Sequence, residues 1–232
     1  MDAIANYSSS DTDDPESEPR QDPHEGKVRQ FPHVDGQFAT TVFFKVPPSS
    51  ELTTLLDAMD TRDSQPSTRE TASPQWTPMP ADELHLSLSR TVPIVDAQRH
   101  SLLAELTKAI DKLGKKRTKR LRQGPPVPLD IRIGPQSMLL TNDDASRTFL
   151  ALTAHDPTTT LHDIVDATTT VFTRHGLPGY YPEKKMHVSI AWCLGDHRHG
   201  APRPPFRLAA WTVPVDTVTC RIGKKDFDIP LI

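Results

Sequence analysis

Cysteine is scarce in this sequence, with two in 232 residues, and so small a number provides no disulfide framework. The chain also lacks any run of about 20 apolar residues, the length that a helix needs to cross a bilayer. Its first residues lack the basic and then apolar order of a signal peptide. These absences predict a soluble protein of a reducing compartment that binds no membrane.

An excess of charge of one sign is also missing, because the formal net charge is -3. The distribution is uneven: residues 1–26 carry eight acidic residues and one arginine, which leaves 22 acidic and 26 basic residues in the other 206. The body of the chain therefore carries a net charge of +4. A body this weakly basic is compatible with a phosphate-bearing ligand but does not require one.

Two segments are poor in apolar residues and rich in Ser, Pro and charged residues. Residues 1–26 cannot bury enough apolar surface to offset chain entropy, which predicts a disordered acidic tail. Residues 62–80 predict a mobile surface insert. The remainder, 27–232, is long enough for one ordered domain.

Apolar periodicity predicts both strands and helices along the chain. Helices are expected from Ser50 through Asp60, from Asp96 to an end at Gly114, and over Thr160–His175 with an end at Gly176. Strands are expected at Phe38–Val46, Leu129–Ile133, Met138–Leu140, Thr148–Thr153, Val215–Ile222 and Phe227–Pro230. Because strands and helices do not alternate strictly, the order favours an α+β fold of antiparallel sheets with outer helices.

One short pattern occurs twice, as Leu84-His85-Leu86-Ser87 and Met186-His187-Val188-Ser189, 102 residues apart. Side chains alternate between the two faces of a strand, so His85, Ser87 and Ser89 should share one face while the leucines between them are buried. In the second copy His187 and Ser189 share a face in the same way. Each strand then offers an imidazole and a hydroxyl about 7 Å apart.

Two facing imidazoles can act as general base and general acid in one displacement, because an ordinary pKa near 6.5 allows one neutral and one protonated ring. Serine hydroxyls can donate hydrogen bonds to phosphate oxygens where negative charge develops. Such a site needs no metal, cofactor or covalent nucleophile. A single copy of the pattern would indicate only a polar pair on a sheet surface; two copies arise by chance in about a few per cent of such chains.

The chain resembles the 2H phosphoesterase superfamily and, within it, the U6 snRNA phosphodiesterase family. The likeness extends over roughly residues 27–232 and includes Val28–His33, HLSLSRT at His85–Thr91, TNDDASRTFL at Thr141–Leu150, HVSIAWCLGD at His187–Asp196 and CRIGKKDFDIPL at Cys220–Leu231. It implies two pseudo-symmetric lobes whose two histidines and two serines meet in a groove. It also implies an RNA substrate, the 3′ end of U6 spliceosomal RNA with its oligouridine tail, and a nuclear location. We expect a monomer.

The resemblance further implies an aromatic platform for a base six residues before the second histidine, which here is Tyr181. The alternative is that Tyr180 and Tyr181 are both core rings. Lys185 is a further substrate-binding candidate. Animal members carry an amide after the Asn of the Thr141-Asn142 loop, where this chain has Asp143, so a base contact made there can differ.

Two other groups carry weaker signals. The basic run Lys115–Arg120 follows the predicted end of a helix, which suits a solvated helix terminus or an RNA-binding or nuclear-import role. Cys193, His197 and His199 lack the paired spacing of a zinc site, so no metal is expected.

The resulting expectation is a 3′-to-5′ exoribonuclease that removes nucleosides by transesterification and leaves a 2′,3′-cyclic phosphate. A 2′,3′-cyclic nucleotide phosphodiesterase acting on small nucleotides or tRNA splicing products is one alternative, and a non-catalytic RNA-binding module is another. The near symmetry of the motifs leaves open which histidine is the base, and the sequence does not show whether the cyclic phosphate is opened.

Overall fold

In the computed structural model, residues 34–63, 74–120, 127–198 and 207–231 are described. Their strands form one curled sheet in the order β10-β9-β1-β3-β7-β6-β5-β8, with β4 paired to β1 and β2 to β7. Every pair is antiparallel. The strands are β1 (Gln37–Lys45), β2 (Thr77–Pro78), β3 (His85–Ser87), β4 (Val92–Val95), β5 (Leu129–Thr141), β6 (Arg147–His155), β7 (His187–Leu194), β8 (Trp211–Val215), β9 (Thr217–Ile222) and β10 (Lys225–Pro230).

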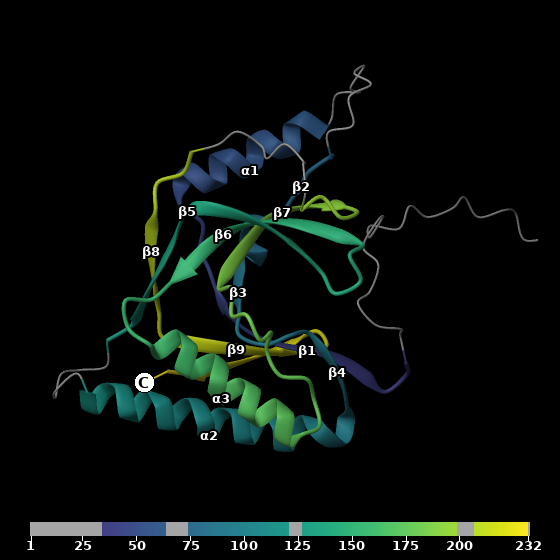
Figure 1. Cartoon of the computed structure of the whole chain (residues 1–232). Helices are drawn as coiled ribbons and strands as arrows, with labels where there is room; N and C mark the ends of the chain where they lie inside the picture. The colour runs from purple at the N-terminus through teal and green to yellow at the C-terminus, as the bar shows by residue number, and fades with distance from the viewer. Residues whose placement is uncertain (1–33, 64–73, 121–126, 199–206, 232) are drawn as a thin grey trace, which may run out of the picture.

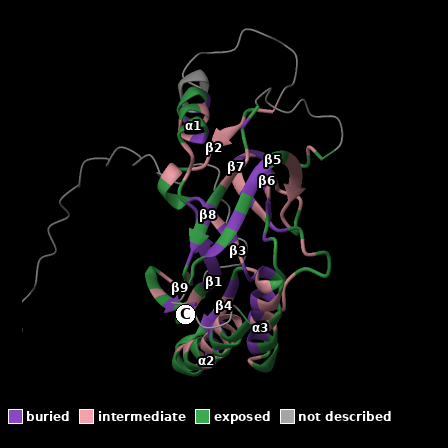
Figure 2. Cartoon of the chain, turned by 90° about the vertical axis from the view of Figure 1, so that its left-hand side faces the viewer, coloured by how far each residue is buried: buried purple, intermediate pink, exposed green. Residues whose placement is uncertain are grey.

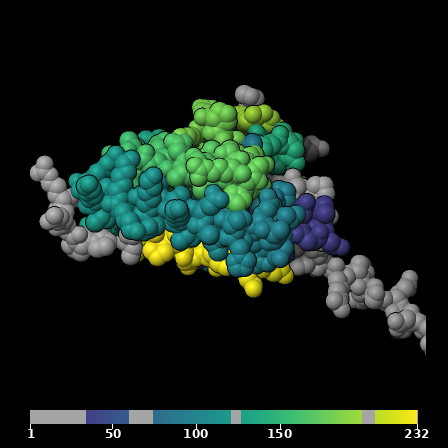
Figure 3. All heavy atoms as spheres, turned by 90° about the horizontal axis from the view of Figure 1, so that it is seen from below, coloured from purple at the N-terminus to yellow at the C-terminus, as the bar shows by residue number. Residues whose placement is uncertain are grey.

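Helices cover the sheet from two sides, which confirms the α+β prediction. Helix α1 (Ser50–Asp63) lies at one end of the molecule, and α2 (Asp96–Arg120) and α3 (Thr160–Arg174) lie together at the other (Figures 1 and 2). Seen from below in Figure 3, α2 and α3 form neighbouring ridges beside the C-terminal strands. None of the described helices is long and apolar enough to cross a membrane.

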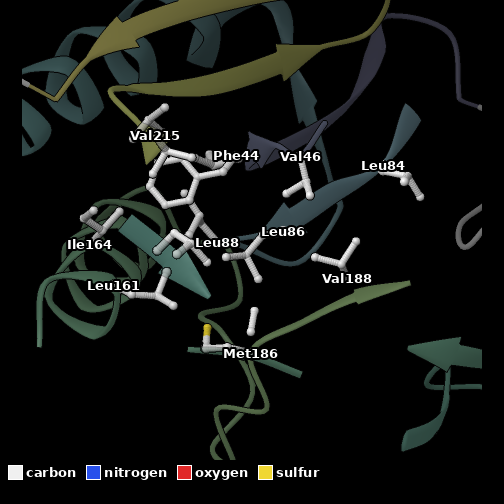
Figure 4. Packing of buried hydrophobic residues seen from close by; sticks show 14 of the residues in the cluster. Phe44, Val46, Leu84, Leu86, Leu88, Leu161, Ile164, Met186, Val188 and Val215 are labelled. Carbon is white, nitrogen blue, oxygen red and sulfur yellow. The ribbon is translucent and has the colours of Figure 1, made fainter. Parts of the chain in front are cut away.

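The two halves of the sheet, β10-β9-β1-β3 and β7-β6-β5-β8, meet at the pairing of β3 with β7. A fully buried row crosses this junction, in which Phe44 lies opposite Leu86, Leu86 opposite Val188, and Val188 opposite Leu152. Figure 4 shows Leu86, Leu88 and Phe44 gathered with Leu161 and Ile164 of α3. Each of these side chains is worth about 1.5–3 kcal/mol of burial, which fixes the face that each motif strand presents to the core.

Helix α3 follows its predicted pattern, because its buried residues recur at spacings of three and four: Leu161, Ile164, Val165, Thr168, Val171 and Phe172. It ends at Arg174, with His175 as the C-cap, and the predicted Gly176 follows as the first residue after the cap. That glycine has a φ of +71°, and Leu177 N–H donates to the Phe172 carbonyl at 2.9 Å while Gly176 N–H donates to that of Thr173 at 3.1 Å. This is the Schellman arrangement, which favours glycine.

The predicted end of α2 at Gly114 is wrong, because the helix continues to Arg120. Gly114 is buried on the same helix face as Leu102, Leu106 and Ile110, four residues after the last of them. Its packing offsets the roughly 1 kcal/mol that glycine costs inside a helix. The basic run therefore lies on the last turns of α2, where Arg117 donates to the carbonyls of Val127 and Pro128.

Several strand boundaries also differ from the prediction. Residues 129–141 form one strand with a register irregularity between Ile133 and Ser137, where two strands, Leu129–Ile133 and Met138–Leu140, were predicted. Residues 211–222 form two strands, β8 and β9, and β2 and β4 were not predicted.

Both ends of the predicted insert at 62–80 belong to described elements. Helix α1 reaches Asp63, β2 occupies Thr77–Pro78, and Met79 N–H donates to the Ile190 carbonyl at 2.9 Å. Residues 64–73, like the predicted tail at 1–26 and the Val28–His33 segment, lie outside the described residues.

Candidate active site

The two histidine motifs lie side by side in β3 and β7, in a register that sets Leu86 opposite Val188. In an antiparallel pair this register places His85 opposite Ser189 and Ser87 opposite His187. Opposite side chains share a face with Cβ atoms about 4.5–5.5 Å apart, and the diagonal pair of histidines is about 7–8 Å apart. The pairing is therefore crosswise, with each imidazole beside the hydroxyl of the other motif.

Both imidazole rings are held by the same kind of contact. Nδ1 of His85 lies 2.7 Å from the carbonyl oxygen of Glu83, and Nδ1 of His187 lies 2.6 Å from that of Lys185. A carbonyl oxygen only accepts, so each Nδ1 carries the hydrogen. In both neutral rings Nε2 is then the unprotonated nitrogen that can accept a proton.

The two histidines differ in their surroundings. Burial lowers the pKa of His187 below its ordinary value of 6.5, and the charge of a protonated His85 lowers it further, against the opposing effect of the Lys185 carbonyl. His187 therefore favours the neutral form. The edge of the Phe43 ring packs against His85, with centroids 5.3 Å apart.

All six site residues predicted from the sequence line one pocket of about 670 Å³. This volume is typical of a small-ligand site. The other lining residues include Met79, Ser89, Arg90, Asn142, Asp143, Phe149, Pro178, Tyr180 and Glu183. The structure thus brings together His85, Ser87, Tyr181, Lys185, His187 and Ser189 in a single concavity.

Ser89 does not have the free hydroxyl expected from its place in the motif. Strand β3 ends at Ser87, and the Ser89 hydroxyl accepts from Val42 N–H at 2.8 Å and donates to the Arg90 carbonyl at 2.9 Å. Its side chain is buried and fixes the turn after the strand.

Tyr181 lies at the surface, with 39% of its area exposed, so the alternative that both tyrosines are core rings is wrong. Tyr180 is the half-buried ring and packs against the core, and burial raises the pKa of its phenol to about 12. The guanidinium carbon of Arg90 lies 4.1 Å from the centroid of the Tyr181 ring. Sequence reasoning did not name Arg90 as a site residue, although it lies in the HLSLSRT segment three residues after Ser87.

Among the other polar residues of the pocket, Asn142 stabilises a turn, whereas Asp143 and Lys185 are exposed and form ion pairs. Asn142 holds the β5–β6 turn, because its side chain donates to the Ser146 hydroxyl and accepts from Arg147 N–H, both at 2.9 Å. Asp143 is exposed and pairs with Arg90. Lys185 pairs with Glu183 at 3.0 Å and keeps 48% of its side chain exposed.

No three His, Cys, Asp or Glu side chains gather to hold a metal ion within the described part of the chain. Cys193 is buried, which raises the pKa of its thiol to about 11, and Nε2 of His197 lies 2.8 Å from the Leu194 carbonyl. His199 lies outside the described residues.

Comparison with known proteins identifies the family of this chain. The model of the HVSL family, described as an uncharacterised conserved protein, matches residues 2–230. The chain belongs to this family. The matched span includes both histidine motifs and every residue that lines the pocket.

Two relatives carry the name U6 snRNA phosphodiesterase 1. The Bos taurus protein is 27% identical over 90% of this chain and 75% of its own length, and the Homo sapiens protein is 28% identical over the same shares. These relatives confirm the family resemblance recognised from the motifs. Kluyveromyces marxianus Usb1 shares the fold, with a TM-score of 0.52 and 13% identity over 83% of this chain and 98% of that structure.

Proposed function

We propose that this chain is a metal-independent RNA phosphodiesterase that trims the 3′ end of U6 spliceosomal RNA as a 3′-to-5′ exonuclease. The observation that carries the proposal is the crosswise pairing of His85 with Ser189 and of Ser87 with His187 in one pocket, with both Nδ1 atoms held by backbone carbonyls. The names of the relatives supply the substrate. The enzyme then acts as a monomer in the nucleus, where such RNA is processed.

The reaction is a transesterification within the RNA. Nε2 of His187 accepts the proton of the penultimate 2′-hydroxyl, the 2′-oxygen forms a bond to the adjacent phosphorus, and the bond from phosphorus to the terminal 5′-oxygen breaks. Nε2 of His85 donates a proton to that leaving oxygen. The hydroxyls of Ser87 and Ser189 donate to the non-bridging oxygens. The products are a nucleoside and a 2′,3′-cyclic phosphate, which water can open to a phosphate.

The assignment of His187 as base predicts the acidic limb of the pH profile. A base must be neutral, and burial together with a protonated His85 holds the pKa of His187 below 6.5. We expect kcat/KM to fall on the acidic side with an apparent pKa below 6.5, a value that belongs to the coupled pair. The measurement is kcat/KM of a short oligouridylate against pH; an acidic limb at or above 6.5 contradicts the assignment.

Full activity is expected in excess EDTA, because the four side chains supply the acid, the base and the charge stabilisation that a metal would otherwise provide. The test incubates the protein with an RNA that has an oligouridine tail, in chelator, and maps both product ends. Activity restored only by one divalent ion contradicts the proposal. Binding without turnover indicates an RNA-binding module, and turnover of small cyclic nucleotides alone indicates the cyclic phosphodiesterase.

Replacing Tyr181 with alanine should weaken binding of a 3′-terminal nucleotide by about 1–3 kcal/mol, the usual contribution of a base stacked on an aromatic ring. The loss should be similar for uridine and adenosine ends, since each base has a π face. Titration of uncleavable 2′-O-methyl oligonucleotides measures it. Tyr181→Phe keeps the ring and should keep the affinity, whereas a folded Tyr181→Ala variant with unchanged affinity would contradict stacking on this ring.

The basic run on α2 has a local explanation. Lys115 pairs with Asp111 at 2.6 Å one helical turn earlier, Arg117 holds two carbonyls, and Arg120 lies 3.9 Å from Asp163. These contacts favour a helix-terminus role for this run over RNA binding or nuclear import. The proposed nuclear location therefore rests on the proposed substrate alone.

A further inference from the structure

Three residues that line the pocket are joined by contacts between segments from both halves of the sheet. Arg90 follows β3, Asp143 lies in the turn between β5 and β6, and Tyr181 lies between α3 and β7. Nη2 of Arg90 donates to both carboxylate oxygens of Asp143, at 3.1 and 3.0 Å, while the guanidinium lies over the Tyr181 ring. We call Arg90, Asp143 and Tyr181 the pocket bridge.

The pocket bridge lies on the rim of the pocket. The side chains of Arg90 and Asp143 are 30% and 67% exposed, and Tyr181 is 39% exposed. An exposed ion pair contributes little to stability and costs side-chain entropy, so stability alone does not account for an arginine held at two points here. All three residues also line the pocket that contains both histidines.

The position of the pocket bridge limits what the pocket can receive. Arg90 covers one face of Tyr181, so a stacked base must use the remaining exposed part of the ring. A strand that continued beyond this base toward the bridge would have to occupy the space of the Arg90–Asp143 pair. A strand that ends there has no such conflict.

We propose that the pocket bridge restricts this enzyme to chain ends, by closing one side of the pocket behind the terminal nucleotide. Arg90 and Asp143 are then specificity-determining residues that reject internal phosphodiesters, and they take no part in proton transfer. The inference rests on the proposed function, since it concerns which RNA phosphates reach His85 and His187.

The test compares a linear oligouridylate with a covalently closed circle of the same length, which has no 3′ end. The wild-type protein should trim the linear RNA and leave the circle intact. Arg90→Ala and Asp143→Ala should each open the circle, at a rate about 10-fold or more above the background measured with the wild-type protein. The double variant should match the singles, because either substitution already breaks the one ion pair.

Arg99 provides a matched control on another face of the protein. It pairs with Asp96 at 2.8 Å and lies over the Phe38 ring at 4.8 Å, and its side chain is 28% exposed, close to the 30% of Arg90. It does not line the pocket. Arg99→Ala should therefore leave cleavage of the circle at the wild-type background.

A binding measurement separates failure of this inference from failure of the proposed function. With uncleavable 2′-O-methyl oligouridylates, the wild-type protein should bind the linear form more tightly than the circle, and the two bridge variants should narrow the difference. The inference would be overturned if both folded variants kept the wild-type cleavage of the circle and the wild-type difference in affinity between linear and circular RNA. It would also be overturned if the wild-type protein opened the circle. Wild-type protein that discriminates in binding but trims nothing would contradict the proposed function alone.

Discussion

Substitution of either histidine, His85→Ala or His187→Ala, should lower the rate of RNA cleavage at least about 100-fold, which corresponds to about 2.7 kcal/mol of transition-state stabilisation. Each variant removes one Nε2 and with it either the acceptor or the donor of a proton. Because both rings act in the same displacement, the double variant should lose little more than either single one. Single-turnover cleavage of an oligouridylate measures the rates without the contribution of product release.

The control for this pair is His155→Ala, which removes an exposed histidine at the end of β6 that does not line the pocket. It should keep the wild-type rate. Loss of one ring-to-carbonyl hydrogen bond costs about 0.5–1.5 kcal/mol, so His85→Ala and His187→Ala should melt within a few degrees of the wild type. A folded alanine variant with wild-type activity would rule out the two-histidine mechanism.

The sequence predicted which residues line the pocket better than how they are arranged in it. Strand alternation was enough to place His85 with Ser87 and His187 with Ser189, because burial of Leu86 and Val188 forces the polar side chains to the opposite face. It could not predict the crosswise pairing, which depends on a single backbone pairing between residues 102 positions apart. The motif sequence likewise does not show that the pKa of His187 is lowered, because that shift depends on surroundings that only the folded chain creates.

Predictions from the local sequence were wrong or incomplete where contacts between distant residues determine the structure. Gly114 is typical of a helix end, but its buried place on α2 makes it part of a packed face. Ser89 continues the alternation of the first motif, yet the chain turns after Ser87 and uses its hydroxyl for the backbone. The Arg90–Asp143 contact joins residues 53 positions apart and has no periodic signal that would predict it. These three cases mark the limit of reasoning from spacing alone.

A substrate with a single 2′-deoxy substitution at the penultimate nucleotide should resist removal of its last nucleoside. The proposed nucleophile is the 2′-oxygen of that nucleotide, activated by Nε2 of His187 and held next to the phosphorus that it attacks. Without the oxygen the reaction has no nucleophile, so the rate should fall to background. Binding should change little, because phosphate contacts and stacking on Tyr181 do not involve the missing group. Product analysis of matched oligouridylates measures both the rate and the chemistry of the new 3′ end.

The matched control moves the same substitution by one position. A 2′-deoxy group at the last nucleotide leaves the nucleophile in place, and that nucleoside should be released at nearly the normal rate with a 2′,3′-cyclic phosphate behind it. The two substrates each contain one deoxy sugar and differ only in its position. The comparison therefore separates loss of the attacking oxygen from any general effect of a deoxy sugar. Normal cleavage of the penultimate 2′-deoxy substrate, with a plain 3′-phosphate, would instead require a water molecule as nucleophile. In that case the two histidines would act on water, and the pairing of His187 with Ser87 across the strands would serve direct hydrolysis.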